Sequence, residues 1–390
     1  MRRSRVLLLV CSLSVVLFLL ASGAALKAGA GDGTFKQMLT FSEVLSYAID
    51  NYVDPVDTDK LMRGAYEGLM GGLDAHSAYL SPEEVAEWNR EAPDAPQADP
   101  GLTVLKTGPV LQVVAVAPGS PADAAKIAVG DQLRKIGGRS LRQLSLDQAL
   151  RLLRGAPGSS VEVELLRTKD FTREIVKLER SPRSGVPYAL DVVQGIAVLK
   201  IHDLDRMPTE ALTQELASVK DRGIDRVLVD LRDVASTDTR HAATVADLFV
   251  TGEVLRLKDR SGRAVETLSA NGKPAWSGRV AVLVNGATAG AGEGLAMILQ
   301  DRRKAPIYGE ATYGLGTEPK LIVLPEGGGL LVPGYVWETM VGKRWNAEGI
   351  APDKVVKSDT RPADGDDEQL KNTLDDFGKT ETPEAAPKAA

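Results

Sequence analysis

The sequence is poor in cysteine, histidine and aromatic residues, and each shortage excludes a kind of site. The 390 residues contain one cysteine, Cys11, so we expect neither a disulfide nor a thiolate metal site in the folded part. The three histidines, His76, His202 and His241, lie far apart and lack the spacing of metal ligands, and we expect no cofactor. A net charge of −6 argues against a nucleic-acid partner. Hydrophobic residues make up 43% of the chain, enough for two or three domains with cores.

The N-terminus combines basic residues with a long apolar run. Arg2, Arg3 and Arg5 precede residues 6–26, which carry no charge. A run of about 20 apolar residues can span a bilayer, and the preceding arginines keep the N-terminus inside. Residues 1–27 therefore predict export to the periplasm or another extracytoplasmic space, as a cleaved signal sequence or as an inner-membrane anchor.

Periodicity and linkers divide the rest of the chain. Residues 35–90 carry two apolar stripes at helical spacing, which predict an N-terminal helical region. Two proline-rich linkers bracket residues 101–180. Strands and helices alternate over residues 188–360, and the apolar strand at 226–231 predicts a sheet covered on both faces. Residues 361–390 predict a closing helix and a disordered tail rich in Pro, Ala and Glu.

Residues 101–180 resemble a PDZ domain. Short strands alternate with turns, residues 129–133 (VGDQL) are similar to a Gly-Asp turn of these domains, and residues 145–154 have an amphipathic helical pattern. PDZ domains add a protein C-terminus as a strand to a sheet edge, and backbone N–H groups of a glycine-apolar loop hold its carboxylate. The resemblance assigns this role to a loop of Gly101, Leu102 and Thr103 and to a groove lined by Leu105, Ala149 and Leu153. The alternative is a PDZ-like cap without a ligand.

A strand, a small-residue turn and a helix follow one another over residues 280–300. Small residues at such a turn let a substrate carbonyl approach, and the helix N-terminus favours developing negative charge. This is the local shape of a nucleophile elbow or an anion site. The expected nucleophile is missing, because no serine or cysteine lies between Asn285 and Lys320.

With its flanks, this stretch resembles the catalytic core of the carboxyl-terminal processing (tail-specific) serine proteases. That family carries a serine in a T-A-S-A-S-E turn, a lysine in an F-G-K-G loop and a glutamine four residues after the lysine. The residues that match the family in this region are Thr288, Ala289, Ala291, Glu293, Gln300, Asp301, Gly309, Glu310, Thr312, Gly314 and Gly316. The resemblance implies an α/β (α+β) fold, with a crotonase-like ββα protease core, an inserted PDZ domain and an N-terminal helical region.

Inert residues occupy the catalytic positions that this resemblance assigns. The nucleophile position is Gly290, the lysine position is Leu315 and the glutamine position is Pro319, with the family spacing kept (315 − 290 = 25). A serine–lysine dyad needs a hydroxyl to attack and a neutral amine to take its proton. Ser236 and Thr237 replace two glycines of the family whose backbone helps to form the oxyanion hole.

Three functional hypotheses fit this sequence. The first is an exported pseudoprotease, a scaffold that binds protein C-termini or regulates an active relative. The second is a serine- or threonine-type endopeptidase with relocated groups: Thr288 or Ser236 as nucleophile, and Lys320 or Lys304 as base. The third is a small-molecule binder that uses the small-residue turn as a cleft. We favour the first, because two separate parts of the catalytic machinery are altered.

Overall fold

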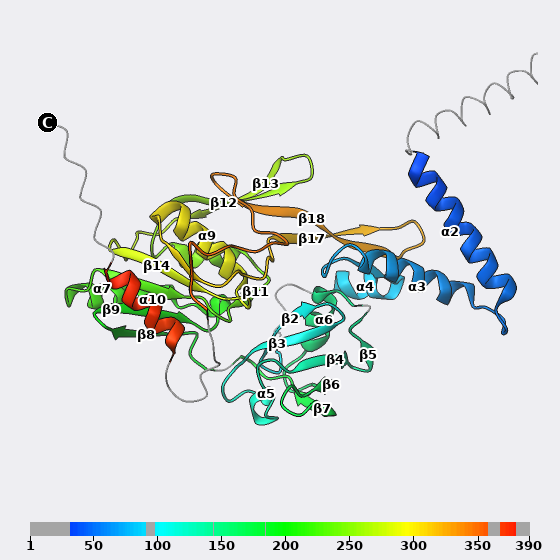
Figure 1. The fold of residues 1–390 in the computed structure, drawn as a ribbon, viewed down its shortest axis with the longest axis horizontal. Coiled ribbons are helices and arrows are strands. Elements are labelled where there is room, and N and C mark those ends of the chain that lie inside the picture. Colours follow the sequence, from blue (N-terminus) through cyan, green and yellow to red (C-terminus); the bar gives the residue numbers. More distant parts are fainter. Residues whose placement is uncertain (1–31, 91–97, 143, 184, 358–366, 380–390) are drawn as a thin grey trace, which may run out of the picture. The chain divides into compact units, whose positions relative to one another are not determined.

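The computed structural model of the protein describes residues 32–90, 98–142, 144–183, 185–357 and 367–379 (Figure 1). The chain divides into two compact units, with the boundary between Tyr66 and Glu67. The predicted export segment at residues 1–27 and the predicted disordered tail from residue 380 lie outside the described residues. In the ranges that are described, no helix is both long and apolar enough to cross a membrane.

Helices dominate the region between residues 32 and 90. They are α2 (Asp32–Asn51), α3 (Thr58–Gly71), which crosses the boundary between the units, and α4 (Pro82–Arg90); the short strand β1 (Ala78–Leu80) precedes α4. Helix α4 begins with proline and has acidic residues in its first turn, where they complement the helix dipole. Helix α2 buries none of its side chains: Phe41 and Val44 are 48% and 61% exposed.

A small domain follows, built on a sheet in the order β2-β3-β4-β6-β7, with β5 paired to β4. Its strands are β2 (Leu102–Thr107), β3 (Val110–Val116), β4 (Gln132–Ile136), β5 (Arg139–Ser140), β6 (Ser160–Leu166) and β7 (Arg173–Glu179). Its helices are α5 (Pro121–Ala124) and α6 (Leu146–Leu153), and Ser145 and Gln148 form a capping box at the start of α6. This arrangement is the one expected for a PDZ domain, and β2 is an edge strand of its sheet.

The largest domain is built on a six-stranded sheet in the order β19-β16-β14-β10-β9-β8. Its strands are β8 (Tyr188–Val193), β9 (Ile196–Ile201), β10 (Arg226–Asp230), β14 (Arg279–Val284), β16 (Ile307–Gly309) and β19 (Lys354–Val355). The helices are α7 (Thr209–Asp221), α8 (Arg240–Ala246), α9 (Ala291–Arg303), α10 (Glu368–Lys379) and the 3-10 turn η1 (Leu204–Arg206). All neighbours in this sheet are parallel except β8 and β9.

Strand β10 explains why this sheet needs cover on both faces. Side chains alternate between the faces of a strand, so a run of apolar residues places apolar groups on each side. Val227 and Val229 belong to the main core with α7, α8 and α9, whereas Leu228 packs in a second cluster with Leu374 and Phe377 of α10. The predicted covered strand is therefore confirmed.

A second sheet, in the order β1-β18-β12-β13, completes the domain, and β17 also pairs with β18. Its further strands are β12 (Gly252–Asp259), β13 (Ala264–Ala270), β17 (Thr317–Val323) and β18 (Gly329–Thr339). A separate two-residue bridge joins β11 (Ala235–Ser236) to β15 (Ala289–Gly290) in parallel. This bridge holds the loop after β10 beside the turn after β14.

The closing helix α10 offers a test of this packing. Phe377 is 1% exposed, and Phe377→Ala should lower the free energy of unfolding by about 3–5 kcal/mol because it leaves a cavity under β10. Val265→Ala, at a 43% exposed position on β13, is the control and should cost less than about 1 kcal/mol. Urea unfolding measures both variants, and equal effects would contradict a sealing role for α10.

Candidate functional site

The turn between β14 and α9 holds the predicted nucleophile position in an unusual backbone conformation. Gly290 is the N-cap of α9, with φ 59° and ψ −112°. Residues with a side chain rarely adopt a positive φ of this kind, whereas glycine does so without steric cost. The turn is therefore fitted to glycine.

The carbonyl oxygen of Ser236 occupies the space where a side chain at residue 290 would begin. A Cβ atom added to Gly290 would lie 1.9 Å from this oxygen, far closer than real contacts allow. The bridge between β11 and β15, which pairs Ser236 with Gly290, holds the carbonyl there. An oxyanion hole needs N–H donors aimed at the reacting centre, and here an acceptor oxygen faces it instead.

The predicted lysine position lies directly beside the predicted nucleophile position. The same added Cβ on Gly290 would lie 3.4 Å from Cδ2 of Leu315, so the structure brings the two positions together. Leu315 is 6% exposed and packs in an apolar cluster with Ala289 and with Leu105 and Val114 of the PDZ domain. The predicted glutamine position, Pro319, lies apart from this cluster on the exposed strand β17, where it pairs with Pro333.

The two residues that replace the family's oxyanion glycines have different surroundings. Thr237 is exposed, whereas Ser236 is buried and its hydroxyl donates to Asp205 over 2.5 Å. The ring of His241 lies 3.0 Å from the same carboxylate. Burial opposes ionisation of Asp205, but the nearby His241 ring, the hydrogen bond from Ser236 and the charge of Arg183 hold its pKa below the usual value. The Ser236 hydroxyl is thus bonded to a weakly basic carboxylate.

A buried carboxylate joins the two halves of the site, and the sequence analysis gave it no role beyond a motif match. Glu293, on α9, is fully buried. Its Oε2 accepts the backbone N–H groups of Gly290 and Leu315 at 2.9 Å and 2.8 Å. Its Oε1 accepts the Gly314 N–H at 2.7 Å and the Thr312 hydroxyl at 2.5 Å. The capping-box spacing of Glu293 after Gly290 is the sequence signal that could have identified it.

Neither relocated nucleophile of the second hypothesis is bonded to one of its predicted bases, Lys304 and Lys320. Thr288 is 0% exposed and its hydroxyl donates to the Leu231 carbonyl at 2.8 Å. Lys304 is exposed at the C-terminus of α9, and the Lys320 side chain lies against Gly334 on β18. In the described part of the chain, the hydrogen bonds of Thr288 and Ser236 include no amine.

The side chains predicted to line the PDZ groove are buried. Ala149 and Leu153 are 1% and 2% exposed and pack within the PDZ core. Leu105 instead contacts the cluster around Leu315. The Tyr313 hydroxyl donates at 2.8 Å to the carbonyl of Lys106 on the edge strand β2, where an added peptide strand would need such acceptors.

The loop predicted to hold a carboxylate has its own constraints. Gly101 has φ 83°, and a Cβ there would lie 2.2 Å from Cβ of Ser120, so glycine is required. Leu102 and Thr103 line a cavity of about 440 Å³ that reaches Ser236. Gly290 does not line this cavity, although its bridge partner Ser236 does. Across the described ranges, no group of three metal-ligating side chains converges.

Glu293→Gln tests the joining role of the carboxylate. The amide offers one acceptor oxygen and turns N–H donors toward backbone N–H groups, so we expect a loss of about 3 kcal/mol in unfolding free energy. Glu348→Gln, at an exposed position, is the control and should have little effect.

The stability difference between the wild type and Glu293→Gln should also depend on pH. Burial raises the pKa of Glu293 from 4.5 to about 7 against the opposing hydrogen bonds. The pKa of Glu293 is higher in the folded protein than in the unfolded chain. The contribution of Glu293 to the stability of the fold is therefore complete below about pH 4.5 and is lost as the pH rises through about 7. The stability difference between the wild type and Glu293→Gln should therefore narrow from about pH 5 to about pH 8. Parallel stability curves for the two proteins would contradict the assignment.

Comparisons with known proteins agree with this geometry. Residues 195–356 match peptidase family S41, and residues 112–167 match the PDZ domain. The chain is 33% identical over 251 residues to the carboxyl-terminal-processing protease of Picosynechococcus sp., covering 63% of this chain and 61% of that relative. It is 26% identical over 329 residues to the carboxy-terminal processing protease CtpA of Bacillus subtilis, covering 83% of this chain and 69% of that relative.

A solved structure supports the fold. The photosystem II D1 C-terminal processing protease is similar with a TM-score of 0.59 and 24% identity, over 84% of this chain and 94% of that one. The predicted fold class, an α/β protease core with a PDZ domain, is thereby confirmed. With an S41 core, a PDZ domain and relatives of one kind, the chain belongs to the family of carboxyl-terminal processing proteases.

Proposed function

We propose that this chain is a pseudoprotease, a family member that binds protein C-termini through its PDZ domain without cutting them. The observation that carries the proposal is the Ser236 carbonyl, which fills the space of a side chain at residue 290. Acyl transfer needs a nucleophile, a base and an oxyanion site. At this centre the first two are replaced by Gly290 and Leu315, and the Ser236 carbonyl oxygen occupies the space of a side chain at residue 290.

The surroundings of Leu315 also support an inactive centre. A catalytic base needs a lone pair that can take the proton of the nucleophile, and a leucine side chain has none. Leu105, Val114, Ala289 and Leu315 form an apolar cluster, in which the core and the PDZ domain pack together. The position is thus built as part of an apolar core.

The proposed role is that of a scaffold or a regulator of proteolysis. A chain with the family's core and PDZ domain is suited to compete for the C-termini that active relatives process, or to pair with such a relative. Two observations argue against an active endopeptidase. Thr288 is fully buried and its hydroxyl donates to a backbone carbonyl, and the Ser236 hydroxyl donates to Asp205. The chain matches 61% of the length of the Picosynechococcus relative, so that protein's activity is not carried over whole.

Restoring the missing pair is the direct test of inactivity. Neither the wild type nor Gly290→Ser with Leu315→Lys should hydrolyse an unstructured peptide above background, because the serine Cβ meets the Ser236 carbonyl. The double variant should also lose about 2 kcal/mol or more of stability through strain at residue 290. Gly286→Ser is the matched control, since a Cβ there would meet its nearest atom at an ordinary 3.7 Å. Turnover by the wild type, lost in Thr288→Ala, would instead favour the relocated endopeptidase.

We also propose that the chain acts outside the cytoplasm. The support is the basic start followed by the uncharged residues 6–26. Deleting residues 2–26 should retain the protein in the cytoplasm. Cell fractionation, and digestion by protease added outside the cytoplasm, measure its location. Equal external digestion of the full chain and the deletion variant would count against export by this segment.

A further inference from the structure

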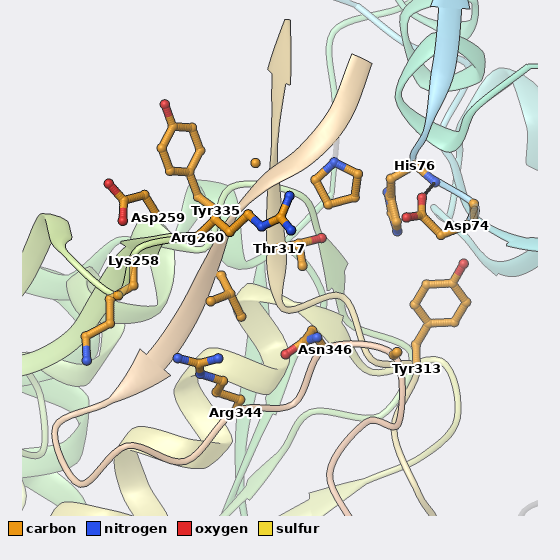
Figure 2. A pocket seen from close by; sticks show the side chains of 16 residues that line it. Asp74, His76, Lys258, Asp259, Arg260, Tyr313, Thr317, Tyr335, Arg344 and Asn346 are labelled. Carbon is orange, nitrogen blue, oxygen red and sulfur yellow. Dashed lines mark hydrogen bonds between the residues drawn. The ribbon is translucent and has the colours of Figure 1, made fainter. Parts of the chain in front are cut away.

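A cavity of about 720 Å³ lies in the second unit, apart from the inert centre (Figure 2). Its walls come from the segment before β1, the turn after β12, the middle of β18 and the loop that carries Leu315. Among its lining side chains are His76, Lys258, Arg260, Tyr313, Tyr335 and Arg344. Its volume falls within the range of ligand-binding pockets, about 300–1,000 Å³.

The cavity opens at a gap in the second sheet. Strand β1 pairs with β18 up to Leu331, and β12 pairs with it from Tyr335 onward. Between them, residues 332–334 have no strand partner on this edge among the pairings of the described chain. Pro333 and Gly334 of this stretch line the cavity. An unpaired strand edge beside a cavity is suited to an extended polypeptide.

The positively charged side chains that line the cavity are not all paired with carboxylates of the protein, so they are able to bind an additional carboxylate. Lys258 and Arg344 share one carboxylate, that of Glu338, at 2.5 Å and 3.1 Å. Figure 2 shows the side chain of Arg260 pointing into the cavity toward Thr317, and Arg260 has no hydrogen bond or ion pair within the described residues. A guanidinium of this kind recognises a carboxylate through paired N–H donors.

The two carboxylates of the lining are already engaged. Oδ1 of Asp74 accepts the backbone N–H groups of His76 and Ser77, both at 2.8 Å. Asp259 is bonded within its own turn, to the Ser261 N–H at 2.9 Å and to the exposed Arg263 side chain at 3.3 Å. The three basic side chains of the lining, Lys258, Arg260 and Arg344, outnumber these two carboxylates, which favours an incoming acidic group beside Arg260.

The cavity adjoins the PDZ domain at two places. The Tyr313 ring lines it, while the Tyr313 hydroxyl donates to Lys106 on the edge strand β2. His76 lines it as well, and its ring lies 3.4 Å from Asp147 on α6. Strand β2 and helix α6 are the elements between which a PDZ domain takes a peptide. A chain leaving that groove at this end would enter the cavity.

We propose that this cavity binds an extended acidic stretch of polypeptide, lying upstream of a C-terminus held by the PDZ domain. This inference rests on the proposed C-terminus-binding function and adds a sequence preference to it. Arg260 and Arg344 contact the acidic side chains, and the open edge at residues 332–334 lies alongside the peptide backbone. The PDZ domain recognises the end of the partner, and the cavity recognises its charge.

The experiment uses the full chain and three fluorescent decapeptides that share one apolar C-terminal tetrapeptide. Their upstream residues are Asp and Glu, Ser and Gly, or Lys, and the acidic peptide is also made with an amidated C-terminus. At low salt the acidic peptide should bind about fivefold more tightly than the lysine peptide, from two exposed charge contacts. This preference should vanish at about 0.5 M salt.

Arg260→Glu should abolish the preference for the acidic peptide. Arg222→Glu is the control, because Arg222 is an exposed arginine at the C-terminus of α7 and does not line the cavity. Circular dichroism checks that both variants fold. An equal loss of affinity for the acidic peptide in the two variants would overturn the cavity site in favour of general surface charge. Displacement of that peptide by inorganic phosphate at the same concentration as the peptide would overturn it as well.

The peptide set separates this inference from the function on which it rests. Affinity that depends on the free carboxylate but not on upstream charge overturns the cavity proposal and leaves C-terminus binding in place. Affinity that depends on charge but survives amidation supports the cavity and overturns the PDZ role. Absence of both dependences overturns both proposals, and presence of both supports them together.

Discussion

The arrangement of the turn at Gly290 and the loop at Leu315 depends on the buried carboxylate of Glu293. It accepts hydrogen bonds from the turn at Gly290 and from the loop at Gly314 and Leu315, which are distant in sequence. A carboxylate with four donors is well satisfied, whereas any of those donors left alone in this dry region would carry a desolvation cost. Glu293 thus holds the predicted nucleophile and lysine positions together through their backbone N–H groups.

The replaced catalytic positions have become packing positions. Leu315 is buried among Leu105, Val114 and Ala289, so the residue at the lysine position contributes to the contact between the core and the PDZ domain. Tyr313, two residues earlier, bonds to the edge strand of that domain. The residue at the predicted lysine position and a contact to the edge strand of the PDZ domain therefore lie in one short loop.

Much of this architecture could be predicted from local patterns. The apolar run at 226–231 predicted a covered strand, because strand side chains alternate between two faces. The spacing between Gly290 and Leu315 predicted their positions in one centre through the family resemblance. The roles of Glu293 and Asp205 could not be predicted, because their partners come from remote loops and a single carboxylate in a sequence carries no sign of how many donors will meet it.

The sequence by itself determined that the centre has no hydroxyl at residue 290 and no amine at residue 315. Only the tertiary structure decided that residue 290 has no room for a side chain. That constraint arises from the Ser236 carbonyl, which lies 54 positions earlier (290 − 236 = 54) and is held by the bridge between β11 and β15. A backbone oxygen is present in every residue, so its obstruction depends on where the fold places it and not on which side chains the sequence contains.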